Sequence, residues 1–250
     1  MDAWRDDIRR LARALVENAD GRVGSESLNH IGLTMGGITV ELHSTPGFMA
    51  NFVCNCRLQK WLRRNADLQC CTMVTFPNVV GEVAVPTRAF NTVYQLYHLY
   101  HHYFYEGVGL RQVVDYYFVV VKSEKRRVKG EEGEVKSEEL RVKNPMALEG
   151  ELKWLGLWKF AGAVMYVLHN VMGLPEDMMI APMDRKRGRM LLDDILNGGN
   201  FGHYDKHHAV GHNLLRLYRD ARLLRFYPSE ALSEPVFRAW HWWWRKRNGL

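Results

Sequence analysis

The sequence has 250 residues, of which 47% are hydrophobic and 25% charged, a composition that excludes a wholly disordered chain and allows one large domain or two small ones. No apolar run approaches the roughly 18–20 residues that cross a bilayer, and the N-terminal segment lacks the apolar stretch of a secretory signal, so we expect no membrane association. The net charge is +6, and residues 200–250 hold nine Lys or Arg against four acidic residues, so the basic excess lies in the C-terminal fifth.

The first 50 residues combine one helix with short strands. Residues 2–18 carry apolar side chains at helical spacing, which predicts an amphipathic helix. Residues 20–27 are rich in Gly, Ser and Asp and predict a loop. Two strands are expected over 28–35 and 38–43, joined in a hairpin at Gly36-Gly37.

The second of these strands has two distinct faces, because side chains alternate along a strand. Its apolar side chains share one face: Ile38, Val40 and Leu42. Its polar side chains share the other: Thr39, Glu41 and His43. A helix over 51–65 and two short strands over 72–85, around a turn at Pro77-Asn78, complete this part of the chain.

From residue 87 onward the sequence has helical character. Helices are predicted over 87–106, 108–121, 151–173, 184–197, 206–226 and 233–246. Residues 121–143 hold 14 charged residues in 23 and repeat the pattern VKSExxRVK, which is typical of a solvated segment. The sequence therefore predicts an α+β domain over 1–86 and a helical domain over 87–250, with a charged, disordered insertion at 121–145.

The cysteines indicate the redox environment. They number four, form no CxxC motif, and are too few for a disulfide scaffold: Cys54, Cys56, Cys70 and Cys71. We therefore expect a reduced, cytoplasmic protein.

The helix over 87–106 is largely apolar but carries one narrow polar stripe that includes His98 and His102. The next helix carries Arg111 and Asp115, one turn apart, after a short connection through Gly107 and Gly109. Three interpretations stay open. Asp115 can pair with these groups in a structural network. Arg111, the two histidines and the adjacent Gln112 can line a wall that binds nucleotide phosphate. His98 and His102 alone can hold a metal ion.

The basic C-terminal fifth also has two interpretations. Arginines recur every third residue over 216–225, and the tail FRAWHWWWRKRNGL interleaves cations with four tryptophans. One interpretation is a site for an anionic partner, such as nucleic acid, nucleotide phosphates or lipid head groups. The other, which we favour, is a solvated helix face with a Trp-rich side packed on the core. We therefore do not favour nucleic acid as a partner, although the basic C-terminus keeps it as an alternative.

Four segments, in this order, resemble an uncharacterised bacterial nucleotidyltransferase-like family of the kind common in Bacteroidetes. They are GGITVELHSTPGFM (36–49), the NxxLQKW motif (55–61), EGVGLRQVVDYY (106–117) and GGNFGHYD (198–205). The resemblance runs from about residue 28 to the C-terminus, apart from the charged repeat. It implies a minimal nucleotidyltransferase fold, with a short mixed sheet and a helical domain behind it.

The resemblance also implies a reaction. Such enzymes transfer a nucleotidyl group from an NTP to an acceptor hydroxyl, which is unknown here, using Mg²⁺ held by three carboxylates. Two of the carboxylates form a DxD motif on one strand, and the third corresponds to Glu41, which the resemblance makes a catalytic and metal-binding residue.

The sequence departs from the three-carboxylate pattern of these enzymes, because it contains no DxD motif. The resemblance then implies a protein truncated at its N-terminus that has lost two of three metal ligands, and we expect the chain to be inactive by itself. The alternative is a non-catalytic binding module that uses the helical domain and the basic C-terminus.

Overall fold

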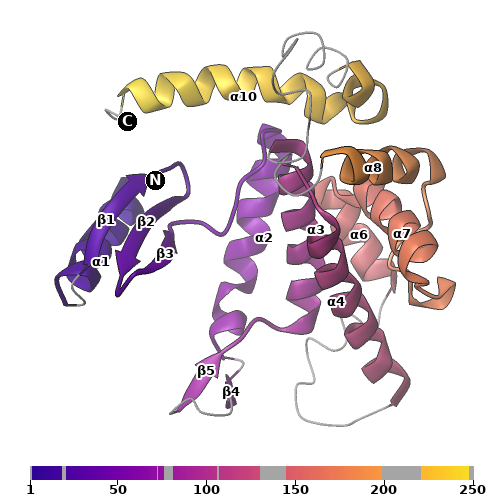
Figure 1. The fold of residues 1–250 in the computed structure, drawn as a ribbon, viewed down its shortest axis with the longest axis horizontal. Coiled ribbons are helices and arrows are strands. Elements are labelled where there is room, and N and C mark those ends of the chain that lie inside the picture. The colour runs from indigo at the N-terminus through magenta and orange to yellow at the C-terminus, as the bar shows by residue number, and fades with distance from the viewer. Residues whose placement is uncertain are drawn as a thin grey trace. The chain divides into compact units, whose positions relative to one another are not determined.

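A computed structural model describes residues 2–18, 21–71, 73–75, 81–105, 107–129, 145–198 and 221–247 (Figure 1). Contacts divide the chain into two compact units, Met1–Ala50 with Ser233–Leu250, and Asn51–Leu232. The fold is α+β, as predicted, with small antiparallel sheets followed by a mostly helical region. No helix of the described residues is long and apolar enough to cross a membrane.

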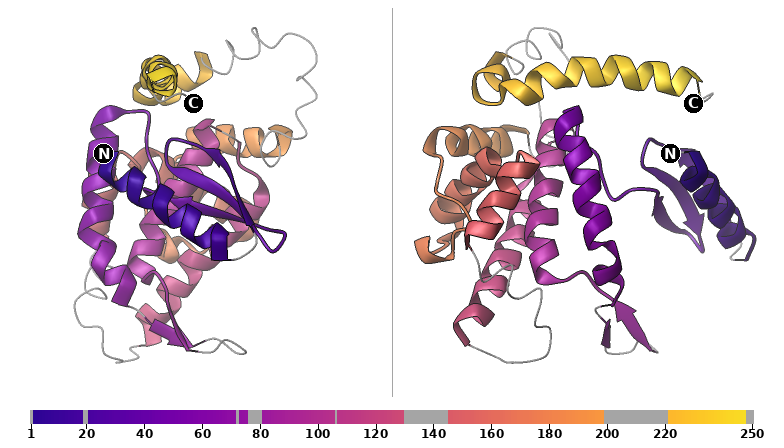
Figure 2. Two further views of the ribbon diagram at one scale, coloured as in Figure 1. Left: turned by 90° about the vertical axis from the view of Figure 1, so that its left-hand side faces the viewer. Right: turned by 180° about the vertical axis from the view of Figure 1, so that it is seen from behind.

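The N-terminal part of the first unit is a three-stranded sheet covered by one helix (Figure 2). Its elements are α1 (Asp2–Asn18), β1 (Gly21–Glu26), β2 (His30–Met35) and β3 (Ile38–His43), with the strands in the order β1-β2-β3. Ala12 of α1 is buried against Ile31 and Leu33 of β2, and partly buried apolar side chains surround this centre: Ile8, Leu15, Val16, Met35, Val40 and Leu42. One face of the sheet therefore carries the core.

The hairpin between β2 and β3 has the predicted turn. Gly36 and Gly37 have φ angles of 55° and 79°, the left-handed conformation that a two-residue turn with the twist of the sheet requires. This turn fixes the register, in which Met35 is paired with Ile38 and His30 with His43.

Residues 21–26 form strand β1, whereas the sequence predicted a loop over 20–27. Strand β1 pairs with β2, and its glycines permit close backbone contact: a Cβ atom on Gly21 would lie 2.3 Å from the Thr34 carbonyl oxygen. Composition alone suggests a loop, whereas the close approach of two strands requires glycine at this position.

The second unit is built from helices. Its elements are α2 (Phe52–Cys71), β4 (Met73–Thr75), β5 (Glu82–Ala84), α3 (Arg88–Tyr105), α4 (Leu110–Lys129), α6 (Pro145–Leu155), α7 (Trp158–Met172), the 3₁₀ turn η1 (Glu176–Met178) and α8 (Arg185–Gly198). Residues 221–226 are also helical. Helix α10 (Pro228–Arg247) begins in this unit and continues into the first.

The unit boundary at Ala50 differs from the domain boundary predicted at residue 86. The reason is that α2 packs on α6: Trp61 Nε1 donates to Glu151 Oε1 at 2.7 Å, and Arg57 donates to the Trp154 carbonyl at 2.9 Å. Helix α2 therefore belongs with the helical elements. The described strands form antiparallel pairs only, whereas the family resemblance implies a mixed sheet.

Several helices differ from their predicted extents. Helix α2 continues to Cys71, beyond the predicted end at residue 65, and α10 begins at Pro228, before the predicted start at residue 233. The helix predicted over 151–173 is two helices, because Gly156 takes a φ of 80° between α6 and α7. Helix α4 continues to Lys129, so the segment predicted as an insertion from residue 121 begins as helix. Residues 130–144, most of the helix predicted over 206–226 and most of the GGNFGHYD segment lie outside the described residues.

Asp184 caps the N-terminus of α8, and its carboxylate accepts the backbone N–H groups of Lys186 and Arg187 at 3.1 and 3.0 Å. Burial raises the pKa of this carboxyl, but the hydrogen bonds and the Arg187 guanidinium outweigh burial and hold the pKa below its ordinary value.

We therefore expect Asp184→Ala to lower the free energy of unfolding by about 1–2 kcal/mol at pH 7. A lowered folded-state pKa stabilises the protein above the unfolded-state value of about 3.9, and this contribution is lost as the pH falls through the folded-state pKa. In denaturant titrations, the free energies of unfolding of the wild type and Asp184→Ala should thus converge below about pH 4. Asp184→Asn, which keeps the cap, should lose less stability at pH 7. A deficit of Asp184→Ala that stays constant down to pH 2 would contradict this role.

Candidate functional site

The polar face of the three-stranded sheet gathers three potential metal ligands. One ligand atom each from His30, Glu41 and His43 lies within 4.8 Å of the other two. Glu41 Oε2 is 3.2 Å from His43 Nε2, and the rings of His30 and His43 lie 5.2 Å apart. Glu41 and His43 are two residues apart on β3, and His30 is opposite His43 on β2, so the three share one face.

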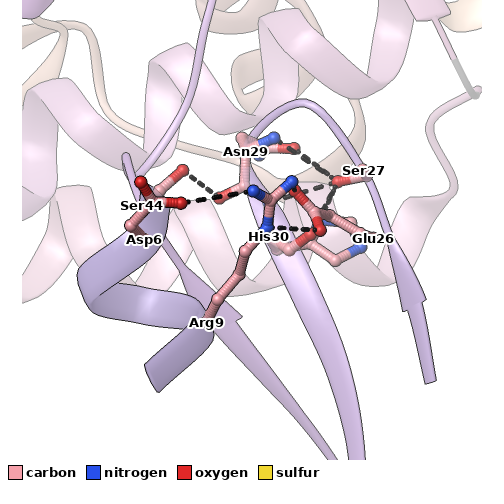
Figure 3. A network of polar contacts seen from close by, with 7 residues as sticks. All are labelled: Asp6, Arg9, Glu26, Ser27, Asn29, His30 and Ser44. Atoms are coloured by element: carbon pink, nitrogen blue, oxygen red, sulfur yellow. Dashed lines mark hydrogen bonds and ion pairs between the residues drawn. The ribbon is translucent and has the colours of Figure 1, made fainter. Parts of the chain in front are cut away.

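Side-chain hydrogen bonds hold one end of this cluster. The Ser27 hydroxyl lies 2.9 Å from His30 Nδ1 and accepts the His30 backbone N–H at 3.2 Å. Ser44 Oγ donates to the Asn29 carbonyl at 3.1 Å, which closes the loop before β2 on the end of β3. Arg9 of α1 makes a two-pronged ion pair with Glu26 beside them, at 3.0 and 2.9 Å (Figure 3). His30 is therefore anchored, whereas Glu41 and His43 are exposed.

The predicted polar stripe on α3 lies in the other unit. The Nε2 atoms of His98 and His102 are 3.2 Å apart, so one imidazole donates to the other. In the part of the chain that the structure describes, no third His, Cys, Asp or Glu converges on this pair. The helix itself is buried along its apolar faces, as predicted, through Thr92, Val93, Leu96, Tyr97, Leu99, Tyr100, Tyr103 and Phe104.

The structure does not bring Asp115 or Arg111 to the histidines. Both side chains are exposed on α4, and no hydrogen bond among the described residues joins either to His98 or His102. The buried face of α4 consists of Val113, Tyr116 and Val120. Positions 111 and 115 lie two residues to either side of Val113, on the opposite face of the helix. Among the described residues, Asp115 therefore has no hydrogen bond to either histidine of the predicted network.

The α3–α4 connection uses the other predicted residues for structure. Gly107, with a φ of 101°, donates its N–H to the His102 carbonyl at 2.6 Å and ends α3. Gln112 Oε1 accepts the N–H of buried Gly109 at 2.8 Å, so its carbonyl is engaged within the first turn of α4. Tyr116 joins the two helices by donating to the Thr92 carbonyl at 3.0 Å.

A cavity of about 410 Å³ lies among α2, α3 and α6. Its lining residues are Trp61, Arg64, Asn65, Ala89, Phe90, Thr92, Ala147, Leu148, Glu151 and Trp154. Glu151 accepts hydrogen bonds from both Trp61 and Arg64, and Asn65 donates to the Trp61 carbonyl. The polar side chains of this cavity thus have hydrogen-bond partners within the fold, which favours a role in packing.

The comparison with known families identifies the class of protein. A family model described as an uncharacterised nucleotidyltransferase matches residues 3–148, more than half of the chain. The protein therefore belongs to this nucleotidyltransferase family. No curated protein and no solved structure matches the chain significantly.

Nucleotidyltransferases typically use Mg²⁺, and the donors around Glu41 do not fit a pair of these ions. Mg²⁺ prefers six oxygen ligands, and two ions need several carboxylates. The cluster, among the described residues, offers one carboxylate and two imidazoles, and the sequence contains no DxD motif. Glu41 lies opposite the core, as predicted, but its immediate partners are nitrogen ligands.

His30 was not predicted as a partner of Glu41. The register of the hairpin would have predicted this contact, because a two-residue turn at Gly36-Gly37 places residue 30 opposite residue 43. The anchoring hydrogen bond between Ser27 Oγ and His30 Nδ1 depends on the loop before β2 and has no comparable signal in the sequence.

Proposed function

We propose that this protein binds a nucleoside triphosphate for nucleotidyl transfer, with Glu41 as the carboxylate that its sheet contributes to the site. In the family reaction an acceptor hydroxyl attacks the α-phosphorus, the bond to the β-phosphate oxygen breaks, and pyrophosphate leaves. The observation that carries the proposal is the exposure of Glu41 on the open polar face of the sheet, in a chain that belongs to this family.

We further propose that these 250 residues bind nucleotide without transferring it. The chemistry requires two carboxylates beyond Glu41. Neither the sequence, which has no DxD motif, nor the described part of the Glu41 cluster supplies them. The acceptor and the preferred base stay open.

Equilibrium binding tests this proposal. A fluorescent NTP with Mg²⁺ or Mn²⁺ present should bind the purified chain, and Glu41→Gln should weaken binding at least about tenfold, or about 1.4 kcal/mol. Glu17→Gln removes the same charge from an exposed position of the same unit and should leave the affinity unchanged. No pyrophosphate should be released from any NTP.

Two results would contradict the proposal. Equal affinities of the wild type and Glu41→Gln would remove Glu41 from the nucleotide site. Pyrophosphate release that Glu41→Gln abolishes would show that other carboxylates complete the site.

The second candidate is a non-catalytic module that binds a polyanion, and α10 favours it. Trp242 and Trp243 are 65% and 51% exposed, and Lys246 and Arg247 lie over their rings at 5.2 and 5.3 Å. Exposed aromatic rings interleaved with cations suit an anionic partner. The exposed Arg111 and the His98–His102 pair are further proposed phosphate contacts of this candidate. Salt-sensitive polyanion binding that is unchanged by Glu41→Gln would favour it.

A further inference from the structure

We propose that His30, Glu41 and His43 form a binding site for a divalent first-row transition ion such as Zn²⁺. The proposal concerns the ion that this face selects, and it stands whether or not the chain binds a nucleotide. In the part of the chain that the structure describes, no other group of three His, Cys, Asp or Glu side chains converges in this way.

The hairpin register brings the three ligands together. The pairing of His30 with His43 places two imidazoles side by side, and Glu41 follows on the same face because side chains alternate along β3. The apolar partners of these strands, Ile31, Leu33, Val40 and Leu42, point to the α1 side. The ligands therefore lie on a folded two-stranded scaffold with its core behind it.

One imidazole has the second contact that metal-binding histidines usually make. The Ser27 hydroxyl lies 2.9 Å from His30 Nδ1, which fixes the ring and leaves Nε2 as the nitrogen for an ion. Ser27 itself is held in the loop by the backbone N–H groups of Asn29 and His30. His43, which is more exposed, can adjust to the ion.

The donor chemistry selects the ion. Two imidazoles and one carboxylate suit Zn²⁺ and related ions, whereas Mg²⁺ prefers oxygen ligands alone. Zinc ligands at about 2.0–2.1 Å in a tetrahedron lie about 3.3–3.5 Å from one another. The distance of 3.2 Å between Glu41 Oε2 and His43 Nε2 is close to this value. The His30 ligand atom lies within 4.8 Å of the other two, so a shift of about 1 Å would bring it to a zinc-binding distance. The exposed side of the site leaves the fourth position to water.

Cobalt absorption measures this site directly, because Co²⁺ in a tetrahedral site has visible bands that the hydrated ion lacks. One equivalent of Co²⁺ added to the full chain without nucleotide should produce these bands, and Zn²⁺ should displace them. His43→Gln should abolish the bands, and Glu41→Gln should weaken Co²⁺ binding at least about tenfold. Both positions are exposed, so thermal denaturation should show that both variants keep the wild-type fold.

Matched variants locate the ion. His98→Gln with His102→Gln removes the other histidine pair and should leave the bands unchanged. The proposal is overturned if His43→Gln keeps the wild-type bands, if the double variant loses them, if an intense near-ultraviolet thiolate-to-cobalt band shows binding by cysteine, or if no bands form at all. Nucleotide binding without these bands would overturn the metal site alone and leave the proposed function intact.

Discussion

Replacing Trp61 by alanine is expected to lower the free energy of unfolding of the helical unit by about 3–5 kcal/mol, the range for truncating a buried aromatic residue. The Trp61 side chain is 2% exposed and stacks on Phe90 at 4.7 Å with the ring planes 12° apart. Its indole N–H also donates to Glu151, which joins α2 to α6. Truncation leaves a cavity and removes both contacts.

Thermal denaturation should show the loss as a fall of about 6–20 °C in the melting temperature, at about 2–4 °C per kcal/mol for a unit of this size. Trp61→Phe is the matched control, because it keeps the stacking on Phe90 and removes the N–H donor. It should lose about 1–2 kcal/mol. A loss below about 1 kcal/mol for Trp61→Ala would contradict a central packing role for this residue.

Gly188→Ala is expected to destabilise the packing of α7 on α8 by about 2–3 kcal/mol, near the upper end of overpacking effects. A Cβ atom on Gly188 would lie 2.3 Å from Tyr166 Cβ and 2.4 Å from Tyr166 Cγ and Cδ1. A change of rotamer cannot move Tyr166 Cβ, so the two helices would have to separate. Chemical denaturation of the purified variant measures this loss.

Gly150→Ala is the matched control for this change. Gly150 is exposed within α6, and a Cβ atom there would have no heavy atom within 4 Å. Alanine at such a position should stabilise the helix by about 0.5–1 kcal/mol. Equal effects of the two substitutions would show that contact with Tyr166 does not decide the outcome at Gly188.

Local sequence patterns predicted the elements whose signals are local. The period of α1, the alternation in β3 and the glycine turn at Gly36-Gly37 each identify an element correctly. Strand β1 escaped prediction because its glycines serve a long-range contact with β2. The break at Gly156 escaped prediction because the apolar pattern runs through it, while the backbone turns there with a positive φ.

The candidate site was predictable in part. Alternation placed Glu41 and His43 on one face, opposite Val40 and Leu42, and the structure agrees. The pairing expected between Asp115 and the histidines required knowledge of which face of α4 packs on α3, and the buried Val113 and Tyr116 set that face. In the NxxLQKW segment that contributes to the resemblance, Leu58 and Trp61 are core residues, so part of the resemblance reflects packing.

The most specific property proposed for this protein is a single metal site in which the sheet presents Glu41 together with two imidazoles. X-ray absorption at the zinc edge, on the full chain with one equivalent of Zn²⁺, tests this claim most directly. The spectrum should show two imidazole ligands and oxygen donors at about 2.0–2.2 Å, with the imidazole contribution reduced in His43→Gln. A sulfur contribution at about 2.3 Å, or an oxygen-only spectrum that His43→Gln leaves unchanged, would contradict it.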